Sequence, residues 1–254
     1  MNQFMQKTLL ALSTTLLFTS GAQAANWTTC NGNIQRWTNN WTNMYLSTIS
    51  FPPGSDWDSH TQYMMSEWNA VAGSSFRYYY GRDTDGTYNK SNGVNEIYFE
   101  NNPNDTYLGI TWSRTNCSGS QYGYVEADIG INTRYAWTLS PFTGTATGSP
   151  YNFDLVMLHE LGHAFGLKHS DGKIATLNTY YFNGGPNGYY NTVQAHGDDR
   201  YGVRILYPTA STSQHELSAS KFKNDGGGGS QLNSTSTSVM YRGNTYAMNY
   251  IVKK

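Results

Sequence analysis

The stretch "VMLHELGHAFGLKHSDG", residues 156–172, carries three of the six histidines of the chain within eleven residues, together with one glutamate. Residues four apart share one face of an α-helix, so His159 and His163 point the same way. Gly166 lets the chain leave that helix through a left-handed conformation, which brings His169 back towards the other two. The spacing therefore predicts that three imidazoles meet at one point.

Three histidines with a fourth position left open are the ligand set of a catalytic zinc ion, whereas structural zinc sites usually have four protein ligands. Glu160 lies beside the first ligand, where its carboxylate can reach a metal-bound water and act as a general base. Solvated or core histidines are the alternative. A chance match of the five fixed positions has a probability of roughly 10⁻⁵ over the chain, so the sequence favours Zn²⁺ bound by His159, His163 and His169.

The N-terminal residues indicate export. A polar start with Lys7 is followed by the apolar run "TLLALSTTLLF" and by "AQA", residues 22–24. This order predicts a secretory signal peptide over residues 1–24, cleaved after Ala24. The apolar run is much shorter than the ~20 residues of a membrane span, and no later segment is long and apolar enough to cross a bilayer. We expect a secreted protein, extracellular or periplasmic, that has no membrane association after cleavage.

Charge and cysteine content limit the partners and the compartment. The net charge is −1 and 13% of the residues are charged, without a basic stripe, so we expect no nucleic-acid partner. Cys30 and Cys117 are the two cysteines. In an oxidising compartment they are predicted to form one disulfide, and two free thiols are the alternative.

Three helices and several strands are predicted along the chain. The helices cover residues 56–71 with Asp56 as cap, a segment from about Phe153 with Asn152 or Asp154 as cap, and residues 198–206 ended by Pro208. Four short runs rich in aromatic and β-branched residues are predicted strands: residues 74–81, 95–100, 108–113 and 124–132. Residues 209–254 read as a linker followed by a β-rich segment, which is an appendage or an incomplete module.

The motif HExxHxxGxxH, formed by residues 159–169, resembles that of the metzincin clan of zinc endopeptidases. Within the clan the chain is most similar to the matrixins, specifically to their short secreted bacterial members. Ser170 directly after the third histidine, the run "DDRYGVRILY" at 198–207 and the strand sequences "GVNEIYF", "LGITW" and "EADIGIN" carry this similarity. It covers about residues 26–208.

The resemblance implies an α+β fold with a twisted mixed five-stranded sheet and three helices, formed by residues 25–208 as the catalytic domain. It also implies a strand beside the substrate cleft that pairs with extended peptides. The expected function is that of a monomeric, secreted zinc metalloendopeptidase acting on protein or peptide substrates, with Glu160 as general base. An exported zinc-containing binding or adhesion protein without proteolytic activity is the alternative.

Some positions depart from the matrixin pattern or add to it. Leu177 stands where matrixins carry the methionine of the turn beneath the zinc, a swap that nearly conserves volume. Tyr180 or Tyr181 could join the zinc ligands only if this loop were shifted. No propeptide cysteine precedes the domain, so any latency has another source.

Other acidic and histidine residues suggest further roles. The resemblance implies that Asp198 and Asp199 support the floor of the active site, and the charge of a helix N-terminus is the plainer interpretation. The run "GRDTDG", residues 81–86, suggests a Ca²⁺-binding loop or simply a turn. The remaining histidines lack metal-ligand spacing and are expected at the surface: His60, His196 and His215.

Overall fold

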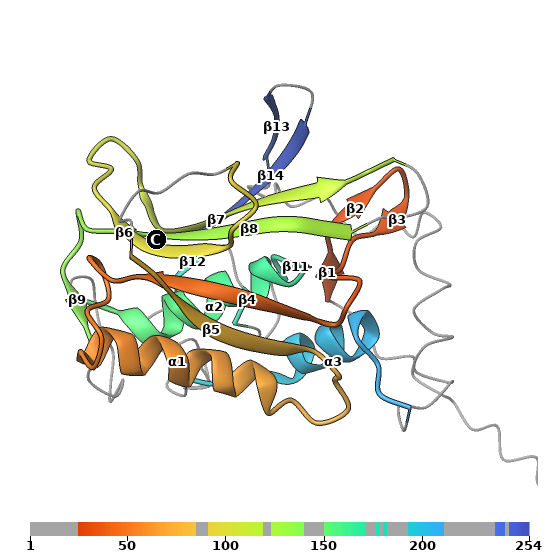
Figure 1. Ribbon diagram of the computed structural model, residues 1–254, viewed down its shortest axis with the longest axis horizontal. Coiled ribbons are helices and arrows are strands. Elements are labelled where there is room, and N and C mark those ends of the chain that lie inside the picture. Colours follow the sequence, from red (N-terminus) through yellow and green to blue (C-terminus); the bar gives the residue numbers. More distant parts are fainter. Residues whose placement is uncertain are drawn as a thin grey trace, which may run out of the picture.

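A mixed β-sheet with helices packed against it forms the body of the protein (Figure 1). The computed structural model describes residues 25–84, 91–118, 123–139, 150–170, 176–177, 180–181, 193–210, 237–241 and 244–253. The proposed signal peptide, Asp85 of the predicted calcium loop and His215 lie outside the described residues. No described helix is both long enough and apolar enough to cross a membrane.

Five strands form the predicted sheet. Their order is β5 (Arg77–Asp83), β4 (Trp41–Ser47), β6 (Glu96–Glu100), β8 (Gly123–Asn132) and β7 (Tyr107–Asn116). All neighbours are parallel except β7, which runs antiparallel to β8. The α+β architecture with a five-stranded mixed sheet is thus confirmed.

The C-terminal segment extends this sheet beyond β7. Strand β14 (Asn244–Lys253) pairs antiparallel with β7, and β13 (Thr237–Tyr241) pairs antiparallel with β14. Strand β12 (Tyr180–Tyr181) lies parallel to the end of β14. With these three the sheet has eight strands, and β13 and β14 lie at the side of the sheet away from α1 in Figure 1.

The burial of each strand follows from its side-chain pattern. In β4 the side chains of Thr42, Met44 and Leu46 are buried and alternate with more exposed neighbours, as a strand with one covered face requires. Central strand β8 is buried along nearly its whole length. The sequence analysis predicted β5, β6, β7 and β8 but missed β4.

Helix α1 (Asp56–Asn69) connects β4 to β5 and buries Met64, Met65 and Trp68 in the core. Its cap is Ser55, whose side chain accepts a hydrogen bond from the amide of Asp58. The prediction that Asp56 caps this helix is therefore wrong by one residue, because the hydroxyl that reaches the free amide comes from the preceding residue.

The other two helices agree closely with prediction. Helix α2 spans Phe153–Ala164, and its cap is Asn152, whose side chain accepts a hydrogen bond from the amide of Leu155. Helix α3 spans Gly197–Leu206. Helices α1 and α2 pack against each other, and α2 also packs against β7 and β8.

Three pairs of two-residue strands lie outside the main sheet. They are β1 (Asn26–Trp27) with β11 (Leu167–Lys168), β2 (Thr29–Cys30) with β3 (Asn33–Ile34), and β9 (Trp137–Thr138) with β10 (Tyr151–Asn152). The predicted disulfide between Cys30 and Cys117 is present and joins residues 87 apart in sequence. In the chain-entropy model such a loop is worth about 4–5 kcal/mol of stability.

Candidate metal centre

Helix α2 is the buried element that carries two of the three histidines. Every residue from Val156 to Ala164 is buried, and His159, Glu160 and His163 have no exposed surface. In most proteins a helix that is buried on all sides is also apolar on all sides. A carboxylate and two imidazoles in such a helix therefore need partners that offset the free-energy cost of their desolvation. Those partners identify the chemistry of the site.

The turn after α2 positions His169. Gly166 has φ of 122°, in the region that side chains disfavour, and a Cβ there would lie 3.0 Å from the carbonyl oxygen of Gln35. After the turn, Leu167 and Lys168 pair with β1, and the Asn26 amide group donates to the carbonyl of His169 at 2.9 Å. The predicted left-handed turn is confirmed, and β1 supplies a hold on His169 that was not predicted.

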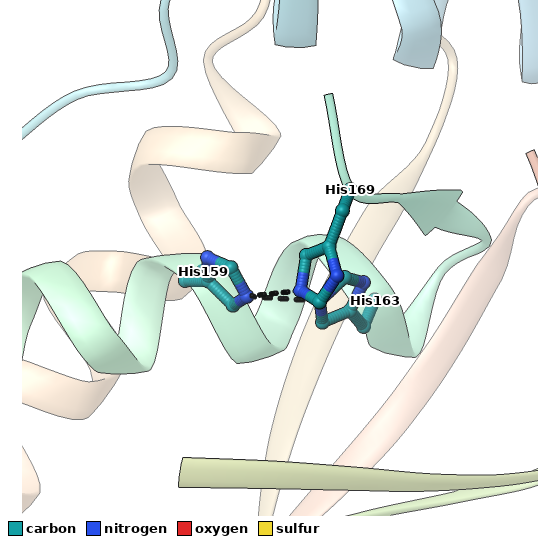
Figure 2. Close-up of side chains that lie close together, drawn as sticks. All are labelled: His159, His163 and His169. Carbon is teal, nitrogen blue, oxygen red and sulfur yellow. Dashed lines mark hydrogen bonds between the residues drawn. The ribbon is translucent and has the colours of Figure 1, made fainter. Parts of the chain in front are cut away.

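The three imidazoles meet at their Nε2 atoms (Figure 2). The Nε2 separations are 2.9 Å between His159 and His163, 3.1 Å between His163 and His169, and 3.2 Å between His159 and His169. A tetrahedral ion with Zn–N bonds of about 2.0–2.1 Å separates its nitrogen ligands by roughly 3.3 Å. The triangle of nitrogens therefore fits zinc after a slight opening of the side chains.

The far sides of two rings determine which nitrogens face the metal. The Nδ1 of His159 lies 2.8 Å from the carbonyl oxygen of Thr176, and the Nδ1 of His163 lies 2.8 Å from that of Leu167. A carbonyl only accepts, so both Nδ1 atoms carry the proton and, in neutral rings, both Nε2 atoms present lone pairs. Two facing lone pairs do not hydrogen-bond to each other, and a cation between them satisfies both.

Burial favours the neutral form of two of the three rings. Burial lowers the pKa of His163 well below its ordinary value of 6.5, and the neighbouring His159 and His169 lower it further. Burial likewise lowers the pKa of His169, with His159 and Lys168 as additional causes. Neutral imidazoles are the form that binds a metal ion, so the site is prepared for one across the neutral pH range.

A residue of the sheet holds the side chain of Glu160 in place. The Thr111 hydroxyl on β7 lies 2.6 Å from Glu160 Oε2 and 3.0 Å from the Glu160 carbonyl oxygen. Two residues earlier on the same strand, Gly109 leaves room for the glutamate, since a Cβ there would lie 2.9 Å from Glu160 Oε1. Thr111 and Gly109 were not identified from the sequence, because nothing local in either segment signals a contact that spans about fifty residues.

Leu177 forms part of the floor beneath the histidine helix, at the place predicted for it. Its side chain is buried and lies over Gly162, whose added Cβ would meet Leu177 Cδ2 at 2.8 Å. Its carbonyl accepts from the amide of Ser170 at 2.7 Å. Leu177 thus packs against α2, and its equivalence to the methionine of the matrixin turn stays a prediction. The side chains of Tyr180 and Tyr181 lie outside those described.

Asp199 organises the same floor from α3. Its buried carboxylate accepts hydrogen bonds from the amides of Thr176, Leu177 and His196, at 2.7, 3.3 and 3.0 Å. Burial raises the pKa of Asp199 to about 6, although these three amides oppose the shift. Thr176 in turn accepts from His159, so one chain of contacts runs from α3 to a metal ligand.

The neighbouring Asp198 contacts the segment that carries the third histidine, His169. It accepts a hydrogen bond from the Ser170 hydroxyl at 2.6 Å, directly after His169. The two aspartates thus support the floor of the site in the way that the resemblance implied, each from its own side.

Two predictions about other residues have different outcomes. His196 was expected at the surface but is buried, because it caps α3 and packs beside the floor. Among the described residues, the three histidines of the motif are the one cluster of three or more metal-ligating side chains. Calcium binding near Asp83 stays a prediction, since residues 85–90 lie outside the described part of the chain.

Comparison with known families supports this site. The family model described as Matrixin matches residues 50–208, which include α1, four of the five strands of the sheet (β5, β6, β7 and β8), the histidine motif and α3. Comparison with the curated proteins finds no significant match.

Proposed function

The chain belongs to the matrixin family and is a zinc metallopeptidase, and we propose that it is a secreted endopeptidase that cleaves extracellular proteins with Glu160 as general base. One observation carries the proposal. Three buried imidazoles converge at one point, and the helix that carries two of them also carries a buried carboxylate, Glu160, which a sheet residue holds. A structural site would add a fourth protein ligand and would need no carboxylate at this place.

The three histidines, Glu160 and Thr111 have different roles in the proposed reaction. His159, His163 and His169 would hold the zinc ion, which when bound lowers the pKa of a water ligand and polarises the carbonyl of the substrate. Glu160 accepts the proton as the water attacks and passes it to the leaving amine. Thr111 fixes the Glu160 carboxylate by its hydrogen bond to Oε2, so the proton acceptor is aimed before substrate arrives.

The sheet provides the surface for an extended substrate. Strand β7 is the last strand of the five-stranded sheet and carries Thr111 next to Glu160. A peptide that adds to this edge forms backbone hydrogen bonds with β7 and places a peptide bond near the metal ligands. Protein or peptide chains in extended conformation are the substrates that this arrangement favours.

Export is supported by two features of the sequence and the fold. Residues 1–24 have the order of a secretory signal peptide, and Cys30 is joined to Cys117 in a disulfide of the kind found in oxidising compartments. We infer that the protein acts outside the cytoplasm after the signal peptide is removed.

Cleavage of casein and gelatin by the purified chain tests the proposal. We expect cleavage that a zinc chelator abolishes and added zinc restores. Glu160→Gln should lower kcat by about 10²–10⁴-fold, the usual contribution of general acid–base catalysis, while keeping zinc. Glu67→Gln on α1 is the matched control and should keep full activity.

Two results would contradict the proposal. Bound zinc without cleavage of casein, gelatin or a broad peptide library would favour the exported binding protein. Unchanged activity in Glu160→Gln would remove the glutamate from the mechanism.

A further inference from the structure

The C-terminal strand lies along the edge of the sheet that faces the metal centre. Strand β14 pairs antiparallel with β7, from Tyr246 opposite Arg114 to Val252 opposite Tyr107, with one irregularity near its end. Figure 1 shows β14 beside β7, outside the five-stranded sheet. The backbone groups that β7 would offer to a peptide are thus already engaged by the chain itself.

The register brings the middle of β14 next to the residues of β7 that position Glu160. Thr111, which contacts Glu160, lies opposite Asn249, and Gly109, which gives room to Glu160, lies opposite Ile251. Helix α2 and β14 have Cα atoms within 8 Å of each other. The backbone of residues 249–251 therefore passes the place where a substrate must present its peptide bond.

A second strand pairs with the end of β14. Strand β12 pairs in parallel with the end of β14, with Tyr180 opposite Val252 and Tyr181 opposite Lys253. β12 follows the floor residue Leu177 by three residues in the chain. β14 thus runs between the sheet edge and the loop that follows the third histidine, in extended form, as a bound peptide would.

Simple protection of a sheet edge does not explain this choice of edge. The five-stranded sheet has two outer strands, β7 at the metal centre and β5 at the opposite side. Within the described residues, no strand pairs with β5 on the side away from β4, whereas β7 is covered by a ten-residue strand. The covered edge is the one that a substrate needs.

We propose that residues 244–253 are an internal pseudosubstrate that competes with peptides and so lowers the activity of the peptidase until the strand is displaced or removed. This inference rests on the proposed function, because it names the occupant of the same substrate edge. A tethered strand competes at an effective concentration that reaches millimolar for short flexible tethers, so it excludes peptides that bind more weakly. Competition of this kind raises KM and leaves kcat unchanged.

Breaking the strand in the zinc-loaded full-length protein tests the proposal. In an antiparallel strand the amides of successive residues alternate between the two neighbours, so Asn249→Pro with Tyr250→Pro removes one amide that faces β7. We expect kcat/KM for a fluorogenic peptide to rise about 10-fold or more through a lower KM, with kcat unchanged. Gly227→Pro with Gly228→Pro, which lies outside β14, is the matched control and should match the unmodified chain.

A synthetic peptide of residues 244–253 provides a second readout. It should inhibit the double-proline variant competitively and inhibit the unmodified chain much less, since the edge there is already covered. Equal kcat/KM in all three proteins, or equal inhibition by the peptide, would overturn the proposal.

Hydrogen exchange separates this inference from the proposed function. In the double-proline variant the amides of residues 107–114 that face β14 should exchange faster, while those that face β8 and those of α2 keep their protection. This readout needs no catalysis, so a chain that never cleaves peptides still reports whether β14 covers β7. Unchanged exchange along β7 would show that the strand does not occupy this edge in solution.

Discussion

Gly109→Ala should impair catalysis without disturbing the metal ligands. A Cβ at this position would lie 2.8 Å from Val156 Cγ1, 2.9 Å from Glu160 Cγ and 2.9 Å from Glu160 Oε1. Carbon atoms in contact normally lie about 3.5–4.0 Å apart, so the new methyl group has to displace one of these side chains. Val156 is β-branched and buried, which leaves the glutamate as the group that moves.

The magnitude follows from the cost of overpacking. Inserting one methyl group into a filled core costs about 1–3 kcal/mol. If that energy falls on the position of the general base, kcat decreases by about 5- to 150-fold at 1.36 kcal/mol per decade. Zinc affinity should be unchanged within about threefold, because the three atoms nearest to the added Cβ belong to Val156 and Glu160 and not to a histidine.

The assay compares kcat/KM for a fluorogenic peptide with zinc content and thermal stability. Gly197→Ala is the matched control, because a Cβ at this first residue of α3 would meet nothing within 4 Å. Adding Val156→Ala to Gly109→Ala makes room for the methyl group and should restore part of the lost activity. Activity of Gly109→Ala within twofold of the unmodified chain, with normal folding, would refute the placement of Glu160 against β7.

Three further perturbations test the floor and the frame of the site. Burial raises the pKa of Asp199 from 3.8 to about 6, so the stability that this residue contributes is full at acidic pH and is lost as the pH rises from about 4 to 6. Urea unfolding should therefore give a difference in the free energy of unfolding between the unmodified chain and Asp199→Asn, both metal-free, that depends on pH. This difference should favour the unmodified chain by about 1–2 kcal/mol more at pH 5 than at pH 7.5, and a difference that does not change with pH would contradict the prediction. Leu177→Met should change the free energy of unfolding by less than about 1.5 kcal/mol, whereas Leu177→Ala should cost about 2–5 kcal/mol, as measured by urea unfolding; equal losses would show that Leu177 does not fill the space over Gly162. Cys30→Ser with Cys117→Ser should lower stability by about 4–5 kcal/mol without loss of zinc at temperatures where the chain stays folded, and an unchanged melting temperature would refute a constraining role for the disulfide.

The histidine site was predictable because its signal is local. His159 and His163 lie one helical turn apart, and the turn at Gly166 follows from glycine's freedom at positive φ, so a short window of sequence specifies all three ligands. The supporting residues are different. Thr111 and Asn26 reach the site only through the pairing of distant strands, and a threonine in a strand looks the same whether or not a glutamate lies opposite.

Strand β4 shows a second limit of sequence reasoning. Its sequence, WTNMYLS, places aromatic residues and asparagine on one face and Thr42, Met44 and Leu46 on the other. The alternation of polar and apolar residues is therefore weak, although the alternation of burial is clear once the helices cover one face. The register of β14 against β7 is a third case, since pairing across more than a hundred residues leaves no periodic trace in either strand.

The site is assembled from elements that meet only in the finished fold. Helix α2 carries His159, Glu160 and His163. The turn held by β1 positions His169, β7 holds Glu160, and α3 holds the floor. Several of its buried polar groups have partners from another element, such as Glu160 with Thr111 and Asp199 with the Thr176 amide, because a buried polar group without a partner costs about 1–3 kcal/mol. The backbone groups on the outer edge of β7 also need hydrogen-bond partners. Strand β14 of the same chain provides them until a substrate competes for this edge. The proposed catalysis and the proposed inhibition thus depend on one strand, β7, which holds Glu160 through Thr111 and pairs along its outer edge with β14.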